Sequence, residues 1–294
     1  MIRLINTETL CLTLFMGEAI PEYAILSHTW EHDGELSFQD MTAIHQNQER
    51  PGYAKVFNTC KRARTDGISY VWIDSCCIDK TSSSELSEAI NSMYRWYQKA
   101  CVCYAFLSDF DFESASPETA MPGCRWFTRG WCLQELLAPQ NVHFFDVQWR
   151  YIGSKADLKV LISKITRIDE QVLVDNSVVG SIPVARRMSW ASERKTTREE
   201  DIAYCLLGLF DVNMPLIYGE GPKAFLRLQE EIIRNSNDLS IFAFPGPPTS
   251  PSLSLHFCDL LALSTSDFMG CGSLSHIGTD VHWNNAFALT NKGL

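Results

Sequence analysis

The fold of this chain is decided by residues 69–107, which read SYVWIDSCCIDKTSSSELSEAINSMYRWYQKACVCYAFL. The segment begins and ends with short apolar runs, 69–74 and 101–107, which have the length of buried strands. Between these runs, residues 82–84 are three serines, which favour the start of a helix. Apolar residues then recur at helical spacing, at Leu86, Ala89, Ile90, Met93 and Tyr97. The segment therefore predicts a strand, a helix and a second strand, which is the unit of a parallel sheet.

The same alternation continues on both sides of this segment. Toward the N-terminus, residues 23–28 form an apolar run that predicts a buried strand, and residues 53–64 have the spacing of a helix. Toward the C-terminus, residues 131–137 predict a short helix, residues 142–146 a strand, and residues 154–166 another helix. Strands and helices in alternation predict an α/β fold with a doubly wound parallel sheet.

These patterns divide the chain into three parts. Residues 1–166 are the predicted α/β core. Residues 167–245 change to helical patterns, among them Thr197 and Glu200 at the spacing of a capping box, and predict an additional helical layer packed on the core. Residues 246–294 begin with a stretch rich in Gly, Pro and Ser and continue with short strand-like runs, so we expect a linker and a β-rich tail. Because the chain stops within such a run, we expect it to be a piece of a longer protein.

Composition limits the kinds of protein that this chain can be. The formal net charge is −10, so we do not expect a nucleic acid as partner, because phosphate backbones require a basic surface. No apolar run reaches the length of about 18 residues that spans a membrane, and residues 10–16 read as a strand rather than a signal peptide. The eleven cysteines are an odd number, and no Asn-X-Ser/Thr site occurs. We therefore expect free thiols and a cytoplasmic location.

Polar side chains follow the predicted strands at the points where these strands end. Ser27 and His28 end one strand, and Asp74 ends the next. Because the carboxyl ends of parallel strands share the edge where α/β proteins bind ligands, we expect these side chains to meet there. The helix that carries Glu135 begins after a loop from the same edge, so Glu135 and Asp74 are a candidate pair of carboxylates. The alternative is an exposed helical Glu and an Asp that caps the turn after its strand.

Three other patterns have simpler explanations. Residues 219–224 imitate a dinucleotide-binding turn, but Pro222 removes one of the required amides, so the start of a helix is favoured. Cys132 lies at the start of a helix, where thiolates are stabilised, yet no base is evident near it. The cysteines at 76–77 and 101–103 lack the spacing of zinc ligands and are expected in the core, so no metal site is predicted.

Several longer stretches resemble the fungal heterokaryon-incompatibility (HET) domain. Its three sequence blocks are matched by YAILSHTW at 23–30, YVWIDSCCIDK at 70–80 and RGWCLQEL at 129–136. Segments that commonly follow these blocks are similar to residues 187–191, 198–208 and 216–221. The resemblance implies a role in non-self recognition between fungal cells, in which the domain triggers programmed cell death.

The HET domain is in turn similar to TIR domains, which implies a TIR-like (flavodoxin-like) core. In TIR domains a Trp-Cys-x-x-Glu-Leu helix carries the glutamate that NAD⁺ cleavage requires, and residues 131–136 match this pattern residue by residue. The resemblance thus implies that Glu135 is catalytic, with Asp74 as the second carboxylate, and that NAD⁺ is a substrate rather than a cofactor. Nicotinamide leaves as a neutral molecule, so one carboxylate that stabilises the ribosyl cation suffices and no general acid is needed.

Residues around Glu135 are candidates for substrate contacts. A serine at a strand end opens the TIR domain, and Ser27 occupies this position here, followed by His28 at the same edge. Trp30 and Trp131 are candidates for stacking on a ring of the substrate, and Arg129 for pairing with its pyrophosphate. Trp131 is explained equally well as a core residue.

Two functions from different classes follow. The first is a cell-death effector that cleaves NAD⁺ or a related nucleotide after forming a homo-oligomer, with receptor or sensor domains of the incompatibility system as partners. The alternative is a non-enzymatic signalling module that triggers death by homotypic assembly. A third hypothesis is a member that keeps the fold without activity.

Overall fold

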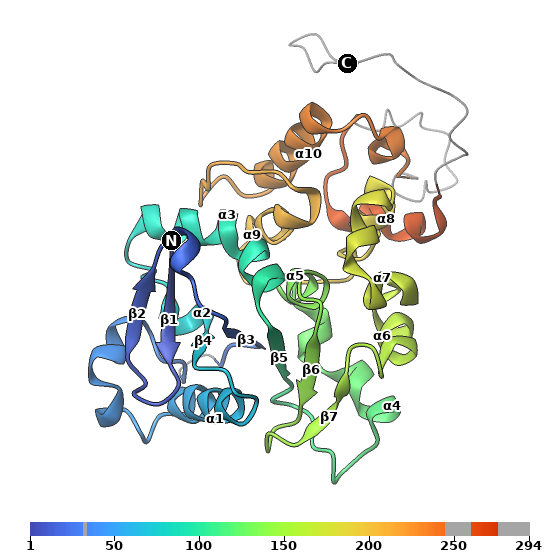
Figure 1. Ribbon diagram of the computed structural model, residues 1–294. Coiled ribbons are helices and arrows are strands. Elements are labelled where there is room, and N and C mark those ends of the chain that lie inside the picture. The colour runs from blue at the N-terminus through green and yellow to red at the C-terminus, as the bar shows by residue number, and fades with distance from the viewer. Residues whose placement is uncertain (32–33, 245–259, 276–294) are drawn as a thin grey trace.

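A computed structural model of the chain describes residues 1–31, 34–244 and 260–275. Over these ranges the strands form one mixed sheet of seven, in the order β2-β1-β4-β3-β5-β6-β7 (Figure 1). Helices pack on the sheet, and a helical region continues from it toward the upper right of the view. The α/β class predicted from the sequence is confirmed.

The four central strands are parallel and come from the predicted apolar runs. They are β3 (Ala24–His28), β4 (Tyr70–Trp72), β5 (Val102–Phe106) and β6 (Val142–Phe145). Strand β3 pairs with both β4 and β5, and β5 pairs with β6. Across the sheet the four parallel strands lie in the order β4-β3-β5-β6. Numbered by their order in the chain, this is second, first, third and fourth, so the winding reverses between β3 and β5. The carboxyl ends of strands at such a reversal are where α/β proteins bind ligands.

Antiparallel strands at both edges make the sheet mixed, so the prediction of a parallel sheet holds only for its centre. Strands β1 (Ile2–Asn6) and β2 (Leu12–Phe15) form a hairpin in which β1 also pairs with β4. At the other edge, β7 (Tyr151–Ser154) returns along β6 after a turn whose backbone amides donate hydrogen bonds to Asp146. Ser154, the predicted first residue of a helix, lies in β7 instead. Helix α6 (Lys159–Thr166) begins five residues later than expected.

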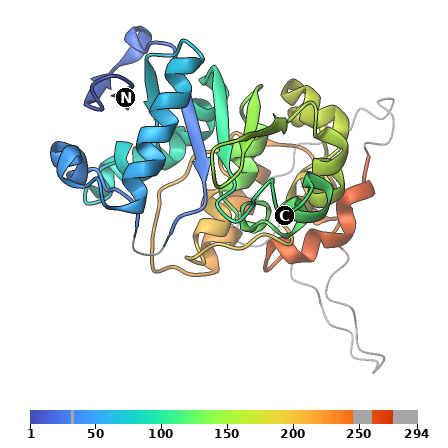
Figure 2. The ribbon, with the colours of Figure 1, turned by 90° about the horizontal axis from the view of Figure 1, so that it is seen from below.

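Different helices cover the two faces of the sheet. On one face, α1 (Pro51–Thr65) runs alongside the strands (light blue in Figure 2). The Tyr104 hydroxyl of β5 donates a 2.7 Å hydrogen bond to Asp66, the residue that caps the C-terminal end of α1. On the other face, the Trp72 ring of β4 packs against aromatic side chains of α3 (Ser83–Lys99). Helix α5 (Cys132–Leu137) lies on this second face and contacts both α3 and β3.

The chain beyond β7 is mainly helical. Residues 167–244, here called the extension, contain α7 (Glu170–Val174), α8 (Val184–Ser189), α9 (Asp201–Tyr204) and α10 (Lys223–Asn235). The extension is joined to α3, because Asn91 of that helix exchanges hydrogen bonds with both backbone groups of Met214. The shorter helical segments that complete the description are η1 (Gly17–Ala19), η2 (Gln39–Gln46), α2 (Asp74–Cys77), α4 (Pro117–Ala120), η3 (Met121–Gly123), η4 (Arg125–Thr128), η5 (Asn176–Ser181), η6 (Gly208–Phe210), η7 (Leu239–Phe242) and η8 (Thr265–Ser273).

The tail differs from the prediction where it is described. Residues 260–275 contain the 3-10 helix η8, capped by Ser264 and packed on α8, where we expected β-structure. The linker and the other strands expected over 246–294 lie outside the described residues. The boundaries placed at residues 166 and 245 stay predictions. Among the described helices, none combines the length and the apolar character needed to cross a bilayer.

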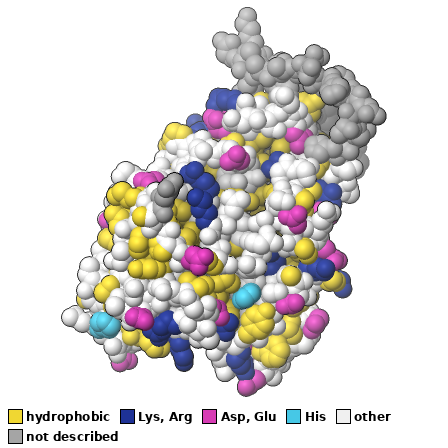
Figure 3. Space-filling model, in the orientation of Figure 1, with side chains coloured by type: hydrophobic (Ala, Val, Ile, Leu, Met, Phe, Trp, Pro, Cys, Tyr) yellow, Lys and Arg dark blue, Asp and Glu magenta, His cyan; other side chains and the backbone are white. Residues whose placement is uncertain are grey.

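Charged side chains of both signs are mixed on the surface. On the face shown in Figure 3, Lys and Arg side chains are scattered among Asp and Glu side chains, and the described residues form no continuous basic surface there. This distribution agrees with the net charge of −10.

Candidate active site

Glu135 is held at the carboxyl end of β3 by a chain of hydrogen bonds. Its side chain is buried although it lies on a short helix, α5. The Ser27 hydroxyl donates a hydrogen bond to Oε2 of Glu135. In turn, Ser27 Oγ accepts a 2.7 Å hydrogen bond from the indole Nε1 of the fully buried Trp126. The strand-end serine therefore fixes the position of the carboxyl group, and the reading of Glu135 as an exposed helical residue is wrong.

Burial changes the ionisation of this carboxyl group. Loss of solvent is the largest effect and raises the pKa of Glu135, and the Asp74 carboxylate acts in the same direction. Hydrogen bonds from Ser27 and Cys132 and the charge of Arg129 lower it, and the net pKa is about 8. This raised pKa favours the protonated form of Glu135 at neutral pH. A cationic ligand beside it would favour the ionised form, since opposite charges in a buried site attract strongly.

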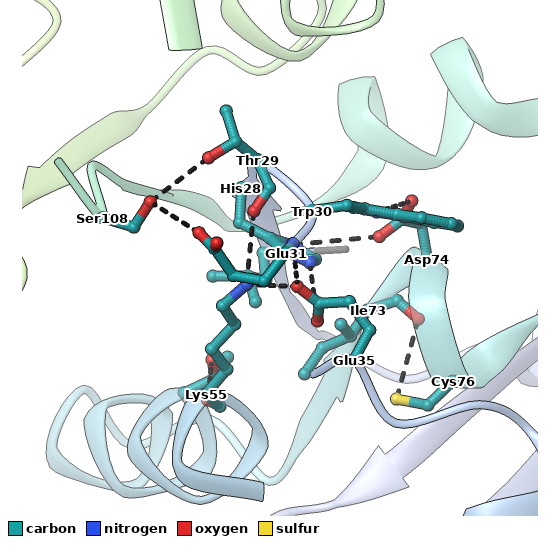
Figure 4. Close-up of polar contacts among 12 residues, drawn as sticks. His28, Thr29, Trp30, Glu31, Glu35, Lys55, Ile73, Asp74, Cys76 and Ser108 are labelled. Carbon is teal, nitrogen blue, oxygen red and sulfur yellow. Dashed lines mark hydrogen bonds and ion pairs between the residues drawn. The ribbon is translucent and has the colours of Figure 1, made fainter. Parts of the chain in front are cut away.

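Asp74 begins α2, directly after β4, and faces the same space. Its Oδ2 accepts a 3.0 Å hydrogen bond from the indole Nε1 of Trp30, whose ring lies beside it in Figure 4. The Lys80 ammonium group sits 3.5 Å from the centre of the same ring, as a cation–π contact. Trp30 is therefore already engaged on one face and through its Nε1, although 43% of the residue is exposed.

Behind Asp74, the side chains of His28, Glu35 and Lys55 form a polar network. His28 Nδ1 lies 3.9 Å from Asp74 Oδ1, and His28 Nε2 lies 3.3 Å from Glu35 Oε2. Lys55, which reaches up from α1 in Figure 4, forms an ion pair with Glu35 and donates a 3.2 Å hydrogen bond to the carbonyl of Thr29. Both His28 nitrogens thus face carboxylates of the protein. The predicted substrate contact of His28 stays a prediction, because His28 also lines the pocket beside Asp74.

Glu35 is the centre of this network and is expected to contribute strongly to stability. Burial by itself would raise the pKa of Glu35, but the hydrogen bonds and charges of His28 and Lys55 prevail and lower it to about 2. Because the folded pKa lies below the unfolded value of about 4.5, the stabilisation is complete above pH 5 and is lost as the pH falls toward 2. A shift of this size corresponds to about 3 kcal/mol.

Replacing Glu35 with Gln is therefore expected to lower the free energy of unfolding by about 3 kcal/mol at pH 7, because Lys55 is left buried without a counter-charge. Urea denaturation at pH 7 and at pH 3 measures this. The matched control is Glu31→Gln, since the Glu31–Arg125 ion pair is exposed and is expected to contribute less than about 1 kcal/mol. Equal losses in the two variants would contradict the assigned network.

These side chains surround one pocket of about 320 Å³. Six of the seven predicted site residues line it, namely His28, Trp30, Asp74, Arg129, Trp131 and Glu135. The seventh, Ser27, lies behind Glu135 and reaches the pocket only through its hydrogen bond. The structure therefore brings the predicted residues together, while their roles in binding and catalysis stay predictions.

Much of the pocket wall was not predicted. Helix α3 supplies an apolar side made of Leu86, Ile90 and Met93. The extension supplies Thr197, Arg198, Asp201 and Tyr218. The apolar face of α3 was recognised in the sequence, but nothing there distinguishes a residue that packs in the core from one that lines a cavity.

Residues of the extension also explain two patterns in the sequence. The predicted capping box is wrong: Glu200, not Thr197, is the N-cap residue of α9, and its side chain makes no cap hydrogen bond. Instead, Glu200 Oε1 accepts hydrogen bonds from the amides of Gly219 at 2.7 Å and Gly221 at 3.1 Å. Those amides are consequently unavailable to a phosphate, and α10 starts two residues later, at Lys223. The reading of residues 219–224 as the start of a helix is confirmed.

Cys132 has the environment of a core residue. It is 2% exposed, and burial raises the pKa of its thiol well above the usual value, with the nearby Glu135 acting in the same direction. A thiol held in its neutral form is a poor nucleophile. Cys76, Cys77 and Cys103 are buried as predicted, and the ten cysteines of the described ranges are all free.

Comparisons with known proteins agree on one family. Residues 23–122 match the family described as heterokaryon incompatibility protein (HET), a match that ends before Glu135. The vegetative incompatibility protein HET-E-1 of Podospora anserina is 44% identical over 236 residues, which are 78% of this chain and 17% of that protein. This chain thus spans about a sixth of the length of that relative. No solved structure matches. With this identity over most of its length, the chain belongs to the heterokaryon-incompatibility (HET) family.

Proposed function

We propose that this chain acts in heterokaryon incompatibility, and that its pocket cleaves the N-glycosidic bond of NAD⁺ or a related nucleotide. Support for the first part is the relative named a vegetative incompatibility protein. Support for the second part is a single observation: Glu135 is buried at the carboxyl end of β3, fixed by Ser27, and lines a cavity large enough for part of a nucleotide.

The chemistry needs few protein groups. Cleavage of NAD⁺ breaks the bond between ribose C1′ and the nicotinamide nitrogen, and the bonding electron pair leaves with neutral nicotinamide. Water adds at C1′ and releases a proton, which gives ADP-ribose, nicotinamide and H⁺. The ribose passes through a cationic state, which an ionised Glu135 stabilises and Asp74 supports. Trp30 or Trp131 would stack on a ring of the substrate, although each already has a polar partner in the protein.

A TIR-like, flavodoxin-like core is part of this proposal. It is supported by the order of the four parallel strands, β4-β3-β5-β6. This order matches the first four strands of the doubly wound flavodoxin type. The carboxyl ends of β3 and β5, where the winding reverses, lie next to Ser27 and thus to Glu135. We also propose that activity in the cell follows self-association.

The proposal predicts that the purified chain releases nicotinamide from NAD⁺ in proportion to protein concentration, or more steeply if self-association is required. Chromatography of the reaction mixture measures nicotinamide and ADP-ribose directly. A wild-type protein that releases no nicotinamide from NAD⁺ or its phosphorylated and deamidated analogues, even at high protein concentration, would contradict the enzymatic proposal.

One observation favours the non-enzymatic alternative. A pKa of about 8 favours the protonated form of Glu135 at pH 7, and a neutral carboxyl group does not stabilise a cation. Expression in fungal cells separates the two hypotheses. If Glu135→Gln kills cells as well as the wild type, assembly alone carries the signal.

A further inference from the structure

The pocket is lined by groups of both charges. Glu135, Asp74 and Asp201 supply carboxyl groups, and Arg129 and Arg198 supply guanidinium groups. Among the described residues, neither guanidinium forms a direct ion pair with a carboxylate, and Arg129 Nη1 donates a hydrogen bond to Thr197 Oγ1 at 3.3 Å. Arg198 acts on Glu200 and Asp201, and Arg129 on Glu135, only through longer-range electrostatics. Two guanidinium groups that line one cavity without a direct ion pair leave N–H donors for an anion.

The extension is fixed to the core where it delivers these groups. Residues 128–130 and 194–196 run side by side: the Lys195 amide donates to the Thr128 carbonyl at 2.7 Å, and the Gly130 amide donates to the Lys195 carbonyl at 2.9 Å. The buried Arg194 adds a 2.9 Å hydrogen bond to the carbonyl of Arg129. The hydrogen bonds between these two backbone segments fix the positions of Thr197 and Arg198 relative to Arg129.

Arg198 is oriented further by an aromatic ring. Its guanidinium carbon lies 4.4 Å from the centre of the Tyr218 ring, and the Tyr218 hydroxyl donates a 3.0 Å hydrogen bond to Asp201. Stacking fixes the plane of a guanidinium group while it leaves the N–H donors at its edge free. Lys80, the third cation of the pocket, is by contrast committed to the Trp30 ring.

We propose that Arg129, Arg198 and the Thr197 hydroxyl form a subsite for the pyrophosphate of a dinucleotide, so that the extension selects pyrophosphate-containing N-ribosyl substrates. The inference rests on the proposed function for the identity of the reacting bond, and on these contacts for the anion. A dinucleotide would place its cationic ring beside the carboxyl groups of Glu135 and Asp74 and its phosphates beside Arg129 and Arg198. The apolar side of α3 lies along the same cavity.

Binding of ADP-ribose to the intact chain, measured by titration calorimetry, tests the subsite without any turnover. Arg198→Gln is expected to weaken binding about tenfold or more, since one charge-assisted hydrogen-bonding group is lost. The matched control is Lys195→Gln, which removes one positive charge from the same segment at a side chain outside the pocket and is expected to change binding less than about twofold. A thermal melt of each variant confirms that it is folded.

Substrate preference gives the second readout. Arg198→Gln is expected to raise KM for NAD⁺ about tenfold while leaving the hydrolysis of nicotinamide riboside, which has no phosphate, unchanged. Equal losses of ADP-ribose affinity in Arg198→Gln and Lys195→Gln, or unchanged affinity in Arg198→Gln, would overturn the subsite. If the wild type binds ADP-ribose through Arg198 but hydrolyses nothing, the subsite stands and the proposed function fails.

Discussion

Glu135→Gln is expected to lower the rate of nicotinamide release by at least about 100-fold, the loss typical of removing one electrostatic contact to a transition state. Gln has the shape of Glu and keeps a carbonyl oxygen to accept the hydrogen bond from Ser27. The substitution removes only the charge that would face the ribosyl cation. Initial rates over a range of NAD⁺ concentrations measure kcat and KM separately.

The pH dependence of the wild type gives the same prediction a second test. Because burial raises the pKa of Glu135 to about 8 and the reaction needs the carboxylate, kcat/KM is expected to rise with pH and to level off above about 8. The bound nicotinamide ring is positively charged and favours the carboxylate, so the pH profile of kcat is expected to level off at a lower pH. Profiles of kcat and kcat/KM that both fall as the pH rises from 6 to 8 would contradict this role.

Stability provides the control for folding. The folded pKa of Glu135 lies above its unfolded value of 4.5, so the folded state holds a proton that the unfolded state has lost, and stability falls as the pH rises from 4.5 to 8. Glu135→Gln removes this dependence. Its melting temperature is therefore expected to equal or exceed that of the wild type at pH 8.5. A variant that melts lower than the wild type at this pH would show that the lost activity reflects misfolding.

Gly208→Ala is expected to destabilise the chain by about 3 kcal/mol or more, at the upper end of the cost of overfilling a packed site. A methyl group at Gly208 would lie 2.0 Å from Cβ of Tyr94 in α3. Because Cβ is fixed to the backbone, a change of rotamer does not relieve the clash, and η6 must move away from α3. A loss of this size lowers the melting temperature by roughly 6–12 °C in a domain of this length.

The matched control is Gly180→Ala, also in the extension, where an added methyl group meets nothing within 4 Å. We expect this variant to change stability by less than about 0.5 kcal/mol. Moving η6 also shifts the part of the extension that lines the pocket, so Gly208→Ala is expected to weaken ADP-ribose binding as well. Similar melting temperatures for the two variants would mean that the extension does not depend on this contact with α3.

The sequence predicts those parts of the molecule that depend on local pattern. Continuous apolar runs identify the four parallel strands, and Ser82 accepts the hydrogen bond of a helix N-cap as expected. The gathering of His28, Asp74 and Glu135 follows from topology, because strand ends of a parallel sheet meet at one edge.

Contacts between distant segments are not visible in the sequence. The indole of Trp126 bonds to Ser27 across 99 residues, and Lys55 of α1 reaches Glu35 within the loop after β3. Each is a long side chain that extends away from its own element, so its partner depends on tertiary packing. A buried Trp or Lys side chain usually has a polar partner. The signal in the sequence for these two contacts is therefore a Trp or Lys within a segment that is expected to be buried.

The fixed contact between residues 128–130 and 194–196 has a consequence for how the protein is made. During synthesis from the N-terminus, Glu135 leaves the ribosome before Arg198 and Tyr218, which line the same pocket. A nascent chain therefore carries Glu135 for some time without the wall that completes its binding site. The proposed activity, which needs the whole pocket, therefore becomes possible only after translation has passed Tyr218.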